Sequence, residues 1–243
     1  CAAIRIDDQL CKQGKGITLY SSFKQNLKGD KIYTVFEDSE GDEWILTNKG
    51  ISIIGKKQVD SDFPFQYIKE ADGIIYLVSQ SDKLASYNFK SRQFKFIEIP
   101  YHVSMINEVK KFDSNTLLLA TDNGLIIYKI KEKEFQLIDI RTSTQPSNVV
   151  QSVYQDHYKE LWIFPQTTGV IRYNPSTKEM QHLFTPADEV IRYERKNKNV
   201  IFEDRQHTLW VLPPEGNLSY YDRENKELKP MLKDSNNPKS VFS

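Results

Sequence analysis

Short apolar stretches alternate with polar turns along most of the chain, and the alternation itself repeats. An apolar stretch ends in Asp, a Trp follows six positions later, and a polar turn with Gly leads into a second apolar stretch. The clear copies are Asp38…Trp44…Gly50, Asp156…Trp162…Gly169 and Asp204…Trp210…Gly216, and the weaker copies are Asp72-Gly-Ile-Ile-Tyr76 and Asp113-Ser-Asn-Thr-Leu-Leu118. The mean period of about 41 residues predicts a repeat architecture.

The second half of each repeat predicts a β-hairpin. A Tyr is followed seven positions later by an apolar residue, with a mainly polar segment between them. These pairs are Tyr87 and Phe94, Tyr128 and Phe135, Tyr173 and Met180, and Tyr221 and Leu228. The spacing fits a strand, a tight turn and another strand. Two-residue alternation over 32–36 and 150–154 predicts the strands that precede the Asp, whereas 188–198 has no sustained apolar face and is predicted to be a loop.

The sequence of each repeat therefore predicts four antiparallel strands, A to D, as in a β-propeller blade. Strand A ends at the Asp, strand B carries the Trp, the B–C turn carries the Gly, strand C carries the Tyr, and strand D follows the polar hairpin turn. We expect an all-β fold with about five four-stranded blades, centred near Trp44, Tyr76, Leu118, Trp162 and Trp210. Residues 236–243 resemble the start of another strand A, so a sixth blade is expected to begin there, as part of a larger, seven-bladed propeller. The predicted division is an N-terminal segment, residues 1–16, and a partial propeller, residues 17–243.

The recurring Trp and Asp residues are predicted to be structural. A Trp on strand B is large enough to fill the wedge between neighbouring twisted sheets. An Asp at the end of strand A can accept backbone N–H groups of the turn that it opens, and Gly41 or Gly50 can supply a positive φ. The predicted structural residues are Asp38, Trp44, Asp156, Trp162, Asp204 and Trp210.

Composition excludes some partners and leaves the cysteines open. Lys+Arg and Asp+Glu number 33 each, so no basic surface for nucleic acid is indicated. No apolar stretch approaches the roughly 18 residues of a membrane helix. The sequence begins at Cys1 without an initiator Met, which indicates a processed or trimmed product. Cys1 and Cys11 could form a disulfide in an exported protein or remain two thiols.

The sequence contains no recognisable catalytic or metal-binding set. The histidines lie in four different repeat contexts without the spacing of metal ligands, and they are His102, His157, His182 and His207. Paired acids such as Asp42 and Glu43 are common, but glycosidase chemistry needs two acids that face each other across a pocket. We therefore expect no catalytic residues, no metal and no cofactor.

The turns between strands B and C are the candidate ligand-binding positions, because B–C and D–A loops of a four-stranded blade share one face. Their amide, hydroxyl and carboxylate groups suit sugar hydroxyls, although an ordinary solvated turn is the more common explanation for any single residue of this kind. The candidates are Asn48, Lys49, Gln80, Asp82, Asp122, Asn123, Gln166, Thr168, Glu215 and Asn217.

The repeats resemble the two-component regulator propeller repeat. Asp38-Ser-Glu-Gly-Asp-Glu-Trp-Ile matches the family's pattern of Asp-x-x-Gly-x-x-Trp-Ile. Asp156-His-Tyr-Lys-Glu-Leu-Trp-Ile and Asp204-Arg-Gln-His-Thr-Leu-Trp-Val match it without the Gly, while Tyr76 and Leu118 replace the Trp in blades two and three. The resemblance covers about residues 17–243.

This resemblance implies an N-terminal periplasmic sensor region of a Bacteroidetes hybrid two-component system that senses glycan-derived oligosaccharides. The family's membrane helix, histidine kinase and DNA-binding domain would then lie in other parts of the receptor, which would act as a homodimer. This chain itself would bind no nucleic acid and would not be an enzyme. The alternatives are a secreted propeller glycoside hydrolase or lyase and, less favoured, a protein–protein scaffold.

Overall fold

The computed structural model describes residues 2–6, 17–21, 27–55, 62–71, 74–79, 81–88, 91, 93–143, 146–167, 169–183, 200–212 and 218–231. These residues form 21 β-strands. No helix long and apolar enough to cross a bilayer is found in this part of the chain. The fold class is all-β, as predicted.

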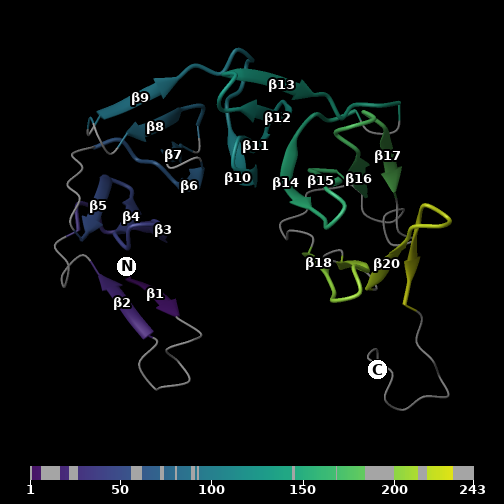
Figure 1. The fold of residues 1–243 in the computed structure, drawn as a ribbon, viewed down its shortest axis with the longest axis horizontal. Coiled ribbons are helices and arrows are strands. Elements are labelled where there is room, and N and C mark those ends of the chain that lie inside the picture. The colour runs from purple at the N-terminus through teal and green to yellow at the C-terminus, as the bar shows by residue number, and fades with distance from the viewer. Residues whose placement is uncertain are drawn as a thin grey trace. The chain divides into compact units, whose positions relative to one another are not determined.

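Five of the sheets follow the five predicted repeats, each with its strands in chain order (Figure 1). The first two consist of β3 (Ile32–Glu37), β4 (Glu43–Thr47) and β5 (Gly50–Ile54), and of β6 (Tyr67–Ala71), β7 (Ile74–Val78), β8 (Leu84–Asn88) and β9 (Gln93–Ile97). The third consists of β10 (Ile106–Asp113), β11 (Thr116–Thr121), β12 (Gly124–Lys129) and β13 (Glu134–Ile138). The last two consist of β14 (Val150–Gln155), β15 (Leu161–Pro165), β16 (Val170–Tyr173) and β17 (Met180–Leu183), and of β18 (Val200–Glu203), β19 (Leu209–Leu212), β20 (Ser219–Asp222) and β21 (Glu227–Pro230).

The predicted hairpins between strands C and D are confirmed by the strand register. Tyr87 pairs with Phe94, Tyr173 with Met180, and Tyr221 with Leu228. Four sheets have four strands, and the Trp44 sheet has three described strands. The four-stranded antiparallel blade of a β-propeller is therefore the repeating unit of this chain.

The two N-terminal strands form a separate hairpin sheet. Strand β1 (Ala2–Ile6) pairs antiparallel with β2 (Ile17–Ser21). Strand β1 thus lies in the predicted N-terminal segment 1–16, and β2 opens the predicted propeller region 17–243. The loop predicted at 188–198 and the start of a sixth blade predicted at 236–243 lie outside the described residues.

The chain divides into two compact units, residues 1–119 with 127–135 and residues 120–126 with 136–243. In the first unit, Trp44 is fully buried in a core with Phe65 and Ile75. Its indole meets the ring of Tyr87 from the next sheet edge-on, at 5.4 Å between centroids and 71° between planes. The Trp therefore joins two neighbouring sheets, which is the wedge position predicted from its size.

The second unit repeats this contact. Trp162 is fully buried with Leu209 and Val211 of the following sheet. The ring of Tyr221 meets its indole at 4.7 Å and 73°. One spatial rule thus serves both units: the Trp of strand B packs against the Tyr of strand C in the following sheet.

The Asp residues organise the A–B turns through the same bonds in each copy. Asp38 Oδ1 accepts the backbone N–H groups of Glu40 and Asp42, and its Oδ2 accepts the Trp44 indole N–H at 2.8 Å. Asp156 and Asp204 accept the indoles of Trp162 and Trp210 at 3.0 and 2.8 Å. Gly41 completes the first of these turns with a φ of 85°, a conformation that glycine adopts without strain.

A second contact joins neighbouring sheets at these turns. Glu70 of β6 accepts the backbone N–H of Ser39 at 2.9 Å and also its hydroxyl. In the second unit, Glu203 of β18 accepts the backbone N–H of His157 at 2.8 Å. A carboxylate at the end of strand A thus holds the A–B turn of the preceding sheet through a charge-assisted hydrogen bond.

The C–D turn of the last sheet predicts an acid-sensitive contribution to stability. The Lys229 ammonium beside Asp222, helped by Asn225, holds the pKa of the Asp222 carboxyl well below its ordinary value. Because the folded-state pKa is depressed, this stability is fully present above the unfolded pKa of about 3.9 and is lost as the pH falls below it.

We expect Asp222→Asn to have a melting temperature that changes less between pH 7 and pH 3 than that of the wild type. Thermal unfolding followed by circular dichroism at both pH values measures this. Glu224→Gln, on the same turn, is the control and should keep the wild-type pH dependence. An equal pH dependence in Asp222→Asn and the wild type would contradict the assignment.

Candidate functional site

The candidate residues of the first B–C turn are bound within their own sheet. Asn48 Oδ1 accepts the Lys31 backbone N–H at 3.1 Å, and its amide donates to Asp30 at 2.9 Å. This hydrogen bond from Asn48 lowers the pKa of the exposed Asp30 carboxyl. The Lys49 backbone N–H donates to the Thr47 hydroxyl at 3.2 Å. The bonds from Asn48 join the B–C turn to the segment that precedes strand A. The B–C turn and that segment therefore lie at the same end of the sheet.

The candidates of the second unit show the same arrangement. Asn123 accepts the side-chain amide of Asn148 at 3.0 Å, and the Gln166 backbone N–H donates to the carbonyl of Val149 at 2.9 Å. Asp122, beside Asn123 in this turn, is half-buried. These residues hold the turns against neighbouring loops. The remaining positions lie outside the described residues: Gln80, Thr168, Glu215, Asn217, Cys1 and Cys11.

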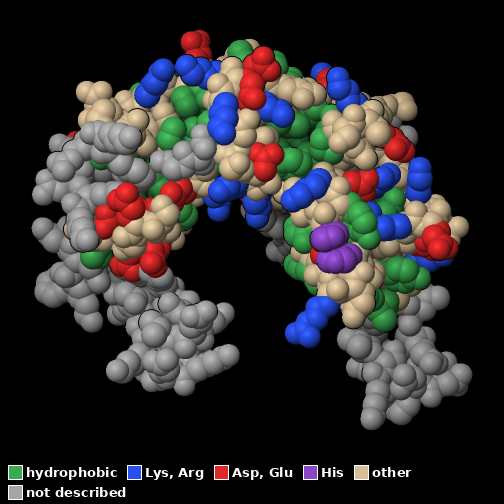
Figure 2. Space-filling model, in the orientation of Figure 1, with side chains coloured by type: hydrophobic (Ala, Val, Ile, Leu, Met, Phe, Trp, Pro, Cys, Tyr) green, Lys and Arg blue, Asp and Glu red, His purple; other side chains and the backbone are tan. Residues whose placement is uncertain are grey.

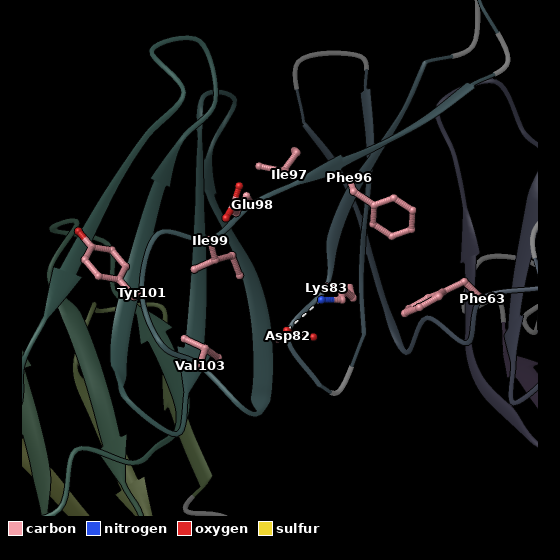
Figure 3. Close-up of a pocket in the computed structure, with 9 residues that line it drawn as sticks. All are labelled: Phe63, Asp82, Lys83, Phe96, Ile97, Glu98, Ile99, Tyr101 and Val103. Atoms are coloured by element: carbon pink, nitrogen blue, oxygen red, sulfur yellow. Dashed lines mark hydrogen bonds and ion pairs between the residues drawn. The ribbon is translucent and has the colours of Figure 1, made fainter.

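Asp82 is the candidate that the structure places in a cavity. A cavity of about 610 Å³ lies in the first unit, at the B–C turn of the second sheet and the segment that leads from β9 to β10. Figure 3 shows Phe63 and Phe96 on one side, Ile99, Tyr101 and Val103 on the other, and the Asp82–Lys83 pair between them. Ile97 and Glu98 complete the lining.

Aromatic faces dominate one side of this cavity and remain accessible. Phe96 is 55% exposed, although its ring packs against Phe63 at 5.8 Å and Phe65 at 6.4 Å. On the other side, the Tyr101 hydroxyl donates to the carbonyl of Phe135 at 3.1 Å, which fixes the ring. An exposed ring held by aromatic neighbours is a flat, rigid surface that needs little ordering on binding.

The polar part of the cavity is equally well fixed. Lys83 Nζ donates to Asp82 at 3.0 Å, and this bond lowers the pKa of the Asp82 carboxyl, so the group is ionised at neutral pH. The turn itself is closed by Ser79, whose hydroxyl accepts the Lys83 backbone N–H at 2.9 Å. The cavity therefore offers an anionic acceptor and a cationic donor beside aromatic faces, the combination expected of a polar ring-shaped ligand.

The structure also brings together two histidines that the sequence does not connect. His157 and His207 lie in the A–B turns of neighbouring sheets, and their rings stack at 3.7 Å and 16°. Glu203 lies beside them, with Oε1 at 3.4 Å from His207 Nδ1. Figure 2 shows the pair in purple on the surface. A sequence signal did exist, since both residues occupy the same kind of turn one repeat apart.

The residues around the histidine pair belong mainly to the framework, and we assign the pair no functional role. The shallow hollow beside it is also lined by Tyr154, Asp156 and Lys159. Asp156 already accepts the indole of Trp162, so it belongs to the framework. Within the described ranges, no group of three or more His, Cys, Asp or Glu side chains could hold a metal ion.

Comparison with known proteins gives one sequence relative. No protein-family model matches the sequence. The chain is 22% identical over 196 residues to a protein named Histidine kinase P4 from Formosa agariphila. The match covers 80% of this chain but 12% of that protein.

Two kinds of solved structure share the fold. An extracellular domain from Bacteroides thetaiotaomicron, described as that of a hybrid two-component system, has a TM-score of 0.60 and 16% identity, covering 84% of this chain and 30% of that one. A catalytically inactive virginiamycin B lyase from Staphylococcus aureus, solved with quinupristin, has a TM-score of 0.60 and 18% identity, covering 91% of this chain and 76% of that one. At such identities the likeness concerns the fold alone.

Two of these proteins are of the kind that the repeats resemble. In sequence, this chain is similar to part of a histidine kinase, and in fold it is similar to the extracellular domains of hybrid two-component systems.

Proposed function

We propose that this chain is the periplasmic sensor propeller of a hybrid two-component system and that it binds glycan-derived oligosaccharides. The observation that carries the proposal is the cavity of the first unit, where the exposed ring of Phe96 lies beside the Asp82–Lys83 pair. A sugar ring has one apolar face, which can pack on an aromatic ring, and hydroxyl groups that bond to carboxylate and ammonium groups. Tyr101 would contact the ligand from the opposite side of the cavity.

The proposal gives the cavity a role in signalling. Two receptor chains would associate in more than one arrangement. The ligand would shift the population toward the arrangement that it binds more tightly. A kinase elsewhere in the receptor would respond to that change. The similarity to Histidine kinase P4 supports this division of labour, since the matched part is a small share of a much longer protein.

Calorimetry with the 243-residue chain and a panel of plant and animal oligosaccharides tests the binding. We expect at least one saccharide to bind, and Phe96→Ala to weaken that binding about tenfold or more, because burial of a Phe side chain contributes about 1.5–3 kcal/mol. The matched control is Phe202→Ala, because Phe202 is 47% exposed and is not among the residues that line the cavity. Equal affinity for Phe96→Ala and the wild type would contradict the assignment of the site.

The alternative function is a propeller enzyme, and the fold shared with the virginiamycin B lyase is what favours testing it. Incubation of the chain with the same oligosaccharides, with the polysaccharides from which they derive and with quinupristin, followed by mass spectrometry, separates the two functions. A sensor leaves every substrate intact. Catalytic amounts of cleaved product would replace the sensor proposal with a hydrolase or lyase.

A further inference from the structure

A second cavity adjoins the first and has a different chemical character. It has a volume of about 510 Å³ and lies in the first unit. One wall is formed by the second sheet, where Tyr76, Ser86 and Lys95 lie side by side across β7, β8 and β9. Phe96, Ile97 and Glu98 line both cavities, so the two meet at the end of β9.

The other wall carries aromatic rings and two further lysines. Tyr128 and Phe135 are stacked at 4.4 Å and 20°, and Lys131 and Lys133 follow in the turn between them. Tyr76 meets Tyr128 edge-on at 6.4 Å, so the two walls are in contact through these rings. Figure 2 shows Lys and Arg side chains, in blue, over the region of β9, β12 and β13.

The charge of this cavity is unbalanced. Three lysines line it against one acidic residue, Glu98. In the described part of the chain, neither Lys95 nor Lys133 forms an ion pair with an acidic side chain. Lysines around a concave surface focus a positive potential on it and raise the local concentration of anions.

The backbone conformation of Lys133 recurs in two other sheets and therefore does not reflect the cavity. Its φ is 56°, and Lys178 and Lys226 have φ values of 61° and 55° at the same position of the C–D turns in the fourth and fifth sheets. The left-handed conformation is therefore a property of the turn and not of the cavity. What distinguishes Lys133 is its place beside the rings of Tyr128 and Phe135.

We infer that the oligosaccharide bound by this chain is acidic, with carboxylate or sulfate groups that lie against Lys95 and Lys133. This inference rests on the proposed function and specifies its ligand. A saccharide that packs on Phe96 would extend past Glu98 into the second cavity, where the lysines pair with its acid groups. The exposed ring of Phe96, which lines both cavities, favours a chain of sugar rings over an acidic peptide.

Calorimetry with matched probes tests the inference. The probes are a short oligogalacturonate, its fully methyl-esterified form, a chondroitin sulfate oligosaccharide with its desulfated form, and poly-glutamate of similar length. We expect a carboxylated or sulfated saccharide to bind about tenfold more tightly than its less charged form. Raising the salt from about 0.05 to 0.5 M should remove most of that difference, because the shorter Debye length screens the lysines.

Variants locate the effect. Lys95→Gln combined with Lys133→Gln should weaken binding of the acidic saccharide about tenfold, since each exposed charge pair makes a modest contribution to binding. The same double variant should leave the affinity for neutral saccharides unchanged. Lys178→Gln is the matched control, because Lys178 occupies the same turn position in another sheet and is not among the residues that line the cavity. This variant should bind every probe like the wild type.

The outcomes separate this inference from the proposed function. Binding of neutral saccharides without a preference for acidic ones overturns the inference and leaves the sensor proposal standing. Tighter binding of poly-glutamate than of any acidic saccharide, or acidic binding that survives the double lysine variant, also overturns it. Failure to bind any saccharide overturns the proposed function and the inference together.

Discussion

Replacement of Trp162 by Ala is expected to lower the free energy of unfolding by roughly 3–5 kcal/mol. The indole is fully buried among Leu209, Val211 and Tyr221 of the following sheet. Its removal leaves a cavity between two sheets that are each held by their own hydrogen bonds and cannot close together fully. The buried carboxylate of Asp156 also loses the indole N–H that it accepts at 3.0 Å.

Urea unfolding followed by tyrosine and tryptophan fluorescence measures this loss. Trp210→Ala is the matched control, because Trp210 makes the same bond to Asp204 but is only partly buried. We expect a clearly smaller loss there. Equal losses at the two positions would show that the hydrogen bond, and not the packing between sheets, is the main contribution of the Trp.

Asp156→Ala is expected to cost about 3–5 kcal/mol, because it removes the buried member of a charge pair and leaves the partner behind. The Asp156 side chain is fully buried and pairs with Arg223 at 2.8 Å. Arg223 also lies 3.3 Å from Glu160, which in turn binds Arg172. This pairing raises the pKa of the Arg172 guanidinium further. Loss of Asp156 thus leaves the network with an excess of positive charge.

Two further variants separate the charge from the turn. Asp156→Asn keeps an oxygen for the backbone N–H of Glu160, which is bonded at 2.9 Å. Its amide, however, would replace Oδ2 and place a donor against both the indole and Arg223, which share that oxygen. We therefore expect a loss nearly as large as that of Asp156→Ala. Asp204→Ala should cost less, because that Asp holds only a turn and an indole at the surface. Urea midpoints that do not differ among the three variants would contradict the network's role.

The blades, their hairpins and their A–B turns could be predicted from the sequence, because the residues that form them recur in the repeats. Any position that recurs in several copies must serve what the copies share, which is the blade. The spacing from Tyr221 to Leu228 predicts a hairpin, and the two residues are paired across β20 and β21. The Asp-to-Trp spacing likewise fits one carboxylate that accepts both turn N–H groups and an indole.

The cavities could not be predicted in the same way, because their residues lie where the repeats differ. Phe63 precedes strand A, and Phe96 lies on strand D, so neither belongs to the shared pattern. Phe96 is accessible because of how its aromatic neighbours pack, which depends on tertiary structure. Among the B–C turn candidates, Asp82 lines a described cavity, while Asn48 and Asn123 bond to nearby loops.

Chemical-shift mapping would locate the binding of a saccharide at the first cavity. An isotope-labelled sample of the chain is titrated with the tightest-binding saccharide, and backbone amide shifts are followed by NMR. We expect the largest changes at Asp82, Lys83 and residues 96–103, which line or adjoin the cavity. Changes centred instead on the His157 and His207 turns, or no changes at a saturating concentration, would contradict it.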